Sequence, residues 1–107
     1  MKSKPVTFPP LPPRLHGLSG EITILRPVQL SKKLGAVGVW EYEHRRIRVQ
    51  GSLPRRLAWE VLLHELAHAA ITDSGIQVEN EKDEERWADA MASAFMHVVT
   101  HLVTERE

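Results

Sequence analysis

The order of apolar and polar positions divides the chain into a proline-rich start, a β-rich middle and a helical second half. Residues 1–20 hold five of the seven prolines and show little periodicity, so we expect a stiff leader that lies along the surface. Apolar and polar side chains alternate over residues 21–25, which predicts a short strand. Residues 28–34 favour a short helix that Gly35 would close in a left-handed conformation.

Two further strands are predicted as a hairpin. Residues 37–43 and 46–49 are rich in β-branched and aromatic side chains, and they flank the polar pair His44 and Arg45. This pattern is typical of antiparallel strands joined by a tight turn. The strands of the hairpin and the strand at 21–25 therefore predict a small sheet.

The second half of the chain predicts two long helices. The first is expected over residues 53–72, with Ser52 as its N-cap and residues 73–75 as its end. The second is expected to begin near Asn80, whose side chain can cap it, and its early acids suit the positive end of a helix. Its apolar residues recur at helical spacing and are Ala88, Met91, Ala92, Phe95, Val98, Val99 and Leu102.

These elements predict one α+β domain over residues 21–107, preceded by the leader at 1–20. About three strands would form a small antiparallel or mixed sheet that packs on the two long helices. Trp59 and Trp87 lie one on each long helix, and we interpret them as core or interface aromatics.

Composition narrows the chemistry that the chain can carry. With 42% hydrophobic and 26% charged residues it has the make-up of a globular protein rather than of a disordered one. The absence of cysteine excludes a disulfide framework, a thiolate metal site and a cysteine nucleophile. No apolar run approaches the roughly 18 residues of a membrane span, so we expect a cytoplasmic protein with no membrane partner.

The net charge of zero conceals two opposite halves. Residues 1–56 hold eleven basic and three acidic side chains, a net charge of +8, whereas residues 57–107 hold three basic and eleven acidic ones, a net charge of −8. Such a division of charge is evidence about binding partners rather than about the fold, and it favours self-association through oppositely charged faces. The basic half carries no recognised nucleic-acid motif, so we do not expect nucleic-acid binding.

The candidate metal-binding and catalytic motif is the sequence His-Glu-Leu-Ala-His, which begins at His64 and ends at His68 in the first long helix. Residues four apart on a helix are neighbours on one face, so both imidazoles can converge on one ion. Glu65 flanks this pair and is placed to act as a general base toward a zinc-bound water. His97 and His101 repeat the spacing on the second helix, but they lie too far along it to join the same site, and we interpret them as a surface pair.

A third metal ligand has to be His, Asp or Glu, because cysteine is absent. The acidic start of the second helix, residues 81–85, follows His68 at a distance that allows an antiparallel return to the metal. Glu84 and Glu85 are the contenders, and helical periodicity slightly favours Glu84 without excluding Glu85. Asp89, one turn further on, is placed to orient a ligand imidazole from behind.

Two motifs resemble the ImmA/IrrE-type zinc metallopeptidases of bacteria and phages. The sequence Leu-Leu-His-Glu-Leu-Ala-His-Ala at residues 62–69 follows a hairpin strand as in that family, and residues 85–92 match its pattern E-x-x-A-[ND]-x-(apolar)-A in register. The resemblance covers about residues 20–100 and implies a minimal zincin-like fold. It also implies zinc ligands at His64, His68 and Glu85 and a catalytic base at Glu65.

The resulting expectation is a small zinc-dependent metallopeptidase that hydrolyses peptide bonds of a protein or peptide substrate. The resemblance suggests a regulatory protein as that substrate. An extended peptide could pair with the edge of the strand at 37–43 or of the strand at 46–50. The alternative is a zinc-binding regulatory or interaction module with little or no turnover, since a chain of 107 residues has few residues left to form the sides of a substrate cleft.

Overall fold

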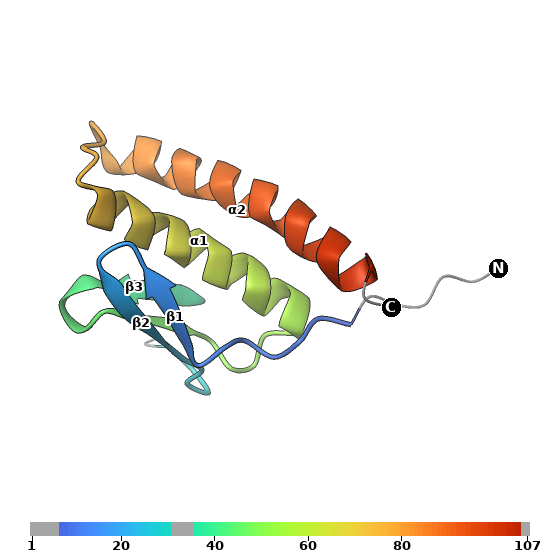
Figure 1. Ribbon diagram of the computed structural model, residues 1–107. Helices are drawn as coiled ribbons and strands as arrows, with labels where there is room; N and C mark the ends of the chain where they lie inside the picture. Colours follow the sequence, from blue (N-terminus) through green and yellow to red (C-terminus); the bar gives the residue numbers. More distant parts are fainter. Residues whose placement is uncertain (1–6, 31–35, 106–107) are drawn as a thin grey trace.

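The computed structural model describes residues 7–30 and 36–105. It contains four strands, a short 3-10 helix and two long helices, and it confirms the predicted α+β class with one strand more than expected (Figure 1). In chain order these are β1 (Arg14–Gly17), β2 (Gly20–Leu25), β3 (Gly38–Glu41), η1 (Tyr42–His44), β4 (Arg46–Val49), α1 (Arg55–Ser74) and α2 (Glu81–Glu105).

The strands form one mixed sheet in the order β1-β2-β4-β3. The predicted hairpin is β3 and β4, which pair antiparallel, although β3 ends at Glu41 and the expected strand residues Tyr42 and Glu43 lie in η1. β2 pairs with β4 in parallel. The alternation in β2 and β4 turns Ile22, Ile24, Ile47 and Val49 to the buried face. Because β4 lies inside the sheet, its edge cannot accept a peptide, and of the two edges considered only β3 is left.

The extra strand lies within the segment expected to be a leader. β1 pairs antiparallel with β2 through a tight turn in which Gly17 lies opposite Gly20. Gly20 has a φ of 135°, which side-chain-bearing residues rarely adopt, so this glycine allows the turn. The Gly-x-x-Gly spacing is a local hairpin signal within a segment whose composition is dominated by proline. Residues 14–17 and 20 are therefore part of the sheet, and Phe8 is buried as well.

Two local predictions differ from the structure. Residues 28–30 form a bend rather than the start of a helix, and the remainder of the predicted helix at 28–34, with Gly35, falls outside the described residues. Ser52 does not cap α1, whose N-cap is Pro54, and its hydroxyl accepts a hydrogen bond from the Gln50 side chain instead. Asn80 does cap α2, because its Oδ1 accepts the backbone N–H of Asp83 at 2.9 Å.

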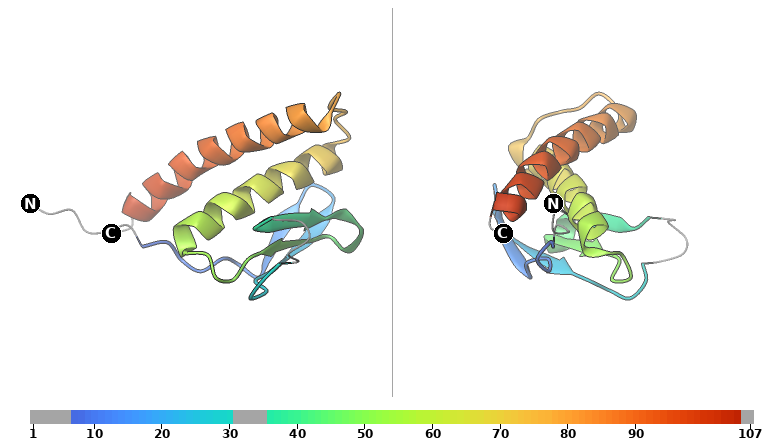
Figure 2. Two further views of the ribbon diagram at one scale, coloured as in Figure 1. Left: turned by 180° about the vertical axis from the view of Figure 1, so that it is seen from behind. Right: turned by 90° about the vertical axis from the view of Figure 1, so that its right-hand side faces the viewer.

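α1 is the central layer, with the sheet on one side and α2 on the other (Figures 1 and 2). Leu62 packs toward the sheet with Ile22, Ile47 and Val49, while its neighbour Leu63 packs toward α2. Adjacent residues of α1 therefore pack into two different hydrophobic cores, one against the sheet and one against α2. This helix begins at Arg55 and continues to Ser74, two residues further than expected, and Gly75 ends it in a left-handed conformation.

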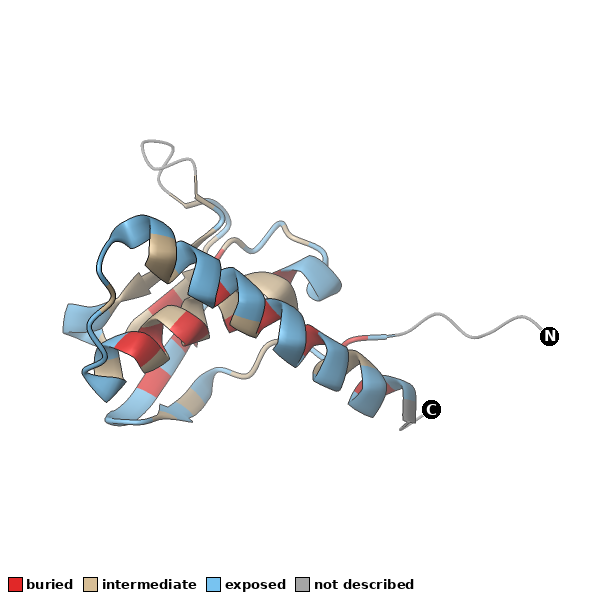
Figure 3. Cartoon of the chain, turned by 90° about the horizontal axis from the view of Figure 1, so that it is seen from above, coloured by how far each residue is buried: buried red, intermediate tan, exposed pale blue. Residues whose placement is uncertain are grey.

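Most of α2 is exposed, and its buried residues recur along the side that packs against the rest of the chain (Figure 3). This buried face is rotated from the predicted one. Its buried apolar residues are Ala88, Ala92, Met96 and Val103. Phe95, Val98 and Leu102, which were predicted on the core face, are 46–57% exposed, and Trp87 is 61% exposed. Trp59, by contrast, packs against both cores and donates its indole N–H to the Pro9 carbonyl at 2.7 Å. No helix in the described part of the chain has the length and apolar character needed to cross a membrane.

Arg45 links the far end of α1 to the sheet. Its guanidinium donates two hydrogen bonds of 2.8 Å to the Asp73 carboxylate, whose side chain is only 2% exposed. The same guanidinium donates to the backbone carbonyls of Gly20 and Glu21 in the β1–β2 hairpin and lies over the Trp40 ring. One side chain thereby holds together the hairpin, β3 and the last turn of α1.

Candidate metal centre

The two histidines of the motif lie on the side of α1 that faces the first turns of α2. Three potential ligand residues meet there: His64 Nε2 lies 3.1 Å from Glu85 Oε2, and His68 Nε2 lies 2.9 Å from Glu85 Oε1. The two Nε2 atoms are 3.2 Å apart. His64, His68 and Glu85 form the group of described residues that could hold a metal ion.

The opposite nitrogen of each imidazole also has a carboxylate partner. His64 Nδ1 lies 2.9 Å from Asp89, and His68 Nδ1 lies 2.6 Å from Glu84. Each imidazole therefore has a carboxylate at both nitrogens. If a metal ion bound the Nε2 atoms and Glu85, the imidazole protons would lie on Nδ1, where Asp89 and Glu84 would accept them and orient the rings.

The structure therefore assigns different positions to the contending acids. Glu85 faces both Nε2 atoms, whereas Glu84 lies behind His68. Glu84 lies near the middle of the predicted apolar stripe of α2, but the buried face of α2 is a different one. Since α2 is rotated about its axis, Glu85 points to the histidines instead. Asp89 lies behind His64, in the position expected for an orienting group.

Glu65 is enclosed between α1 and the edge strand β3. Burial raises the pKa of its carboxyl, an effect that the nearby His68 and His64 and a hydrogen bond from the Trp40 backbone partly oppose. Gly38 makes this enclosure possible, because a Cβ at that position would collide with Val61 and lie 3.3 Å from the Glu65 side chain. Sequence reasoning missed Gly38, although a glycine inside a strand pattern signals close approach of another element.

Replacing Gly38 with alanine should force β3 away from α1. We expect Gly38→Ala to lower the free energy of unfolding by about 2 kcal/mol, the usual cost of overpacking, as measured by urea titration. Gly75→Ala is the control for the chemical shifts, because no atom lies within 4 Å of its added Cβ, whereas its left-handed φ of 73° gives this variant a stability cost of its own. Amide chemical shifts of residues 38–40 and 65 should move in Gly38→Ala and stay in place in Gly75→Ala. Unchanged shifts in both variants would contradict the proposed close contact.

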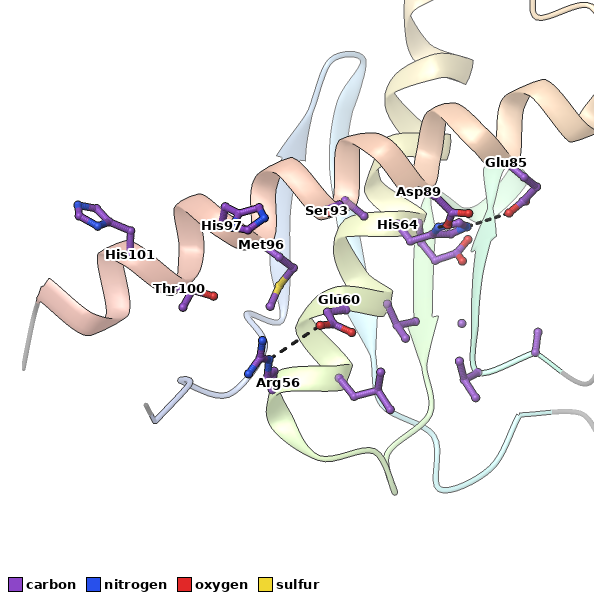
Figure 4. Close-up of a pocket in the computed structure, with 17 residues that line it drawn as sticks. Arg56, Glu60, His64, Glu85, Asp89, Ser93, Met96, His97, Thr100 and His101 are labelled. Atoms are coloured by element: carbon purple, nitrogen blue, oxygen red, sulfur yellow. Dashed lines mark hydrogen bonds and ion pairs between the residues drawn. The ribbon is translucent and has the colours of Figure 1, made fainter. Parts of the chain in front are cut away.

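A groove of about 970 Å³ runs from the histidine cluster along the junction of α1 and α2 (Figure 4). Val37 and Gly38 border it together with His64 and Glu65, so the edge strand β3 lies beside these two residues of α1. Arg56 and His97 line its other end, away from Glu85. The groove thus offers an extended surface next to the cluster, together with a strand edge.

The basic side chains near the hairpin are mostly engaged in internal contacts. Arg46 and Arg48 both contact the Glu41 carboxylate, at 2.7 and 2.8 Å, and the Arg46 hydrogen bond lowers the pKa of Glu41. Arg45 is bound to Asp73. These three arginines therefore stabilise the sheet and its contact with α1, so the positive charge of residues 1–56 is not simply a surface available to partners.

Comparison with known proteins does not identify a family. No family model, no curated protein and no solved structure matches this chain.

Proposed function

We propose that the chain is a zinc-dependent metallopeptidase that holds its metal through His64, His68 and Glu85. The observation that carries this proposal is the convergence of two Nε2 atoms and one carboxylate at separations of 2.9–3.2 Å. The two histidine contacts are to different oxygens of Glu85, and one ligand atom from each of the three residues lies within 4.8 Å of the others. Ligands on a tetrahedral zinc with bonds of about 2.05 Å lie about 3.3 Å apart, so a small shift of the side chains would let all three bind one ion. Two nitrogens and one carboxylate oxygen also form a ligand set typical of catalytic zinc.

Zinc in this position would supply a Lewis acid that polarises a peptide carbonyl and acidifies water. The chain's own contribution begins with Glu65, whose carboxylate lies next to the ligand cluster and outside the ligand set. A carboxylate there can accept a proton from water and pass it to the leaving amine. Its enclosure between Gly38 and the Trp40 backbone restricts its orientation and excludes solvent from one side.

The position of β3 at the edge of the described sheet supports a peptide as the substrate. An extended chain in the groove could form main-chain hydrogen bonds with this edge and so lie alongside Glu65. Main-chain pairing positions a peptide bond whatever the side chains are, and the groove beyond it would accommodate the flanking residues.

Metal analysis tests the ligand set. We expect the purified protein to bind one zinc per chain and His68→Ala to lose stoichiometric binding, as measured by elemental analysis after dialysis. His97→Ala is the matched control, because His97 is an exposed histidine on α2 outside the cluster. Equal zinc content in all three proteins, or none in the wild type, would overturn the proposed site.

The carboxylates behind the histidines should tune zinc affinity. We expect Asp89→Asn and Glu84→Gln each to weaken zinc binding by about 10–100-fold, because each replaces the charged carboxylate acceptor at one imidazole with a neutral amide. Competition with a chromogenic chelator measures the change. Glu81→Gln is the control, since it removes a charge from the same exposed helix start without touching a histidine. If the three variants bind zinc equally, Asp89 and Glu84 do not orient the ligands.

The second candidate function is a zinc-binding interaction module with little turnover. The exposure of two acids at the site favours it, since the side chains of Glu85 and Asp89 are 56% and 73% exposed. Stoichiometric zinc without cleavage of any member of an unbiased peptide library would support this alternative against the peptidase.

A further inference from the structure

α2 carries a second apolar stripe that the fold leaves exposed. Met91, Phe95, Val98 and Leu102 follow one another at intervals of four, three and four residues, and Trp87 precedes them by one turn. This is the heptad spacing of a helix that packs against another helix. Apart from the half-buried Met91, these side chains are 46–61% exposed.

The stripe continues onto neighbouring elements. A mostly apolar depression of about 540 Å³ contains Trp87 and Met91 together with Leu18 of the β1–β2 turn and Ile76 of the α1–α2 connection. Leu18 is 70% exposed and Ile76 is 63% exposed. Three separate segments therefore contribute large apolar side chains to one continuous surface, which we call the α2 patch.

The α2 patch and the metal groove share no lining residue. The groove uses Asp89, Ser93 and His97 of α2, whereas the depression in the α2 patch uses Trp87 and Met91. The two surfaces thus lie on different flanks of the same helix. A partner seated on the α2 patch would leave the groove accessible.

The size of the α2 patch matches half of a protein interface. Its six most exposed side chains are Leu18, Ile76, Trp87, Phe95, Val98 and Leu102. At roughly 100 Å² each they expose about 600 Å², the upper end for a patch on a monomer and close to the roughly 800 Å² that each partner buries in a stable complex.

We propose that the α2 patch is a homodimer interface in which α2 packs against α2 of a second copy. A heptad stripe is complementary to itself, because the side chains of one helix fit between those of an identical helix. A two-fold pairing would cover this stripe on both copies at once. The large apolar area, rather than the opposite net charges of the two halves of the sequence, would then drive self-association.

The native mass tests this proposal. We expect sedimentation equilibrium at micromolar to millimolar concentration to give twice the 12.2 kDa of one chain. Val98→Glu should return it to the mass of one chain, because a buried carboxylate opposes association. Ala90→Glu should leave the dimer intact, since this exposed residue lies about 140° around the helix from Phe95. A wild type of single-chain mass throughout, or a dimer unaffected by Val98→Glu, would overturn the proposal.

Cross-linking keeps the test valid if Val98→Glu impairs folding. The chain has no cysteine, so any disulfide formed by a single introduced cysteine must join two copies. Phe95 lies in the middle of the stripe, where two-fold related residues approach each other in either helix orientation. Phe95→Cys should form covalent dimers under mild oxidation much faster than Ala90→Cys. Equal rates for the two variants would contradict the interface.

Discussion

Glu65→Gln should retain one zinc per chain and lose peptide hydrolysis by about a thousandfold, the contribution typical of a general base. The glutamine fills the same space between β3 and α1 but cannot accept a proton from water. It leaves His64, His68 and Glu85 in place, so the metal content should not change. Elemental analysis and the initial rate of cleavage of a peptide from a library screen measure the two properties on the same sample.

Glu43→Gln provides the matched control. Glu43 is an exposed glutamate of η1 that does not line the groove, so its substitution should leave both zinc content and cleavage unchanged. Cleavage that survives in Glu65→Gln would reject Glu65 as the base. Loss of zinc in Glu65→Gln would instead give Glu65 a structural role in the ligand cluster.

Asp73→Asn should lower the free energy of unfolding by about 1.5–3 kcal/mol, because it removes the charge that accepts two hydrogen bonds from the partly buried Arg45 guanidinium. The Asp73 side chain is 2% exposed, accepts two hydrogen bonds from Arg45 and also has a hydrogen bond with the Ser19 backbone. A loss of this size is a large fraction of the roughly 5–15 kcal/mol that stabilises a typical domain. Urea titration at neutral pH measures it.

Glu21→Gln is the control for this effect. The Arg14–Glu21 pair is 3.9 Å apart and both side chains are more than half exposed, so its loss should cost less than about 0.5 kcal/mol. Similar destabilisation in the two variants would mean that the buried pair contributes no more than an exposed one.

The same pair predicts a pH dependence of stability. Hydrogen bonds from Arg45 hold the pKa of Asp73 below its ordinary value of 3.8. A carboxyl whose pKa is lowered by folding stabilises the protein above the ordinary pKa, and this contribution is lost as the pH falls through the lowered value. Between neutral pH and about pH 3, the stability of the wild type should therefore fall more steeply than that of Asp73→Asn. Parallel pH profiles for the two proteins would contradict this.

Much of the secondary structure followed from local patterns. The alternation in β2 and β4, the hairpin of β3 and β4 and the cap of α2 at Asn80 depend on nearest neighbours along the chain, and all are present in the structure. β1 was missed, although its turn carried a local glycine signal, because the flanking prolines dominated the composition of that segment. Local pattern therefore located most elements but not the full extent of the sheet.

The sequence by itself determined that His64 and His68 share one helix face with Glu65 beside them, since the helical repeat requires it. It also implied a nearby acid from the second helix. Only the tertiary structure decided which acid this is, because the rotation of α2 depends on how it packs against α1. That rotation directs Glu85 to the histidines, and it also turns Phe95, Val98 and Leu102 to the surface. Periodicity shows which residues share a stripe, whereas packing between helices selects which of two stripes is buried.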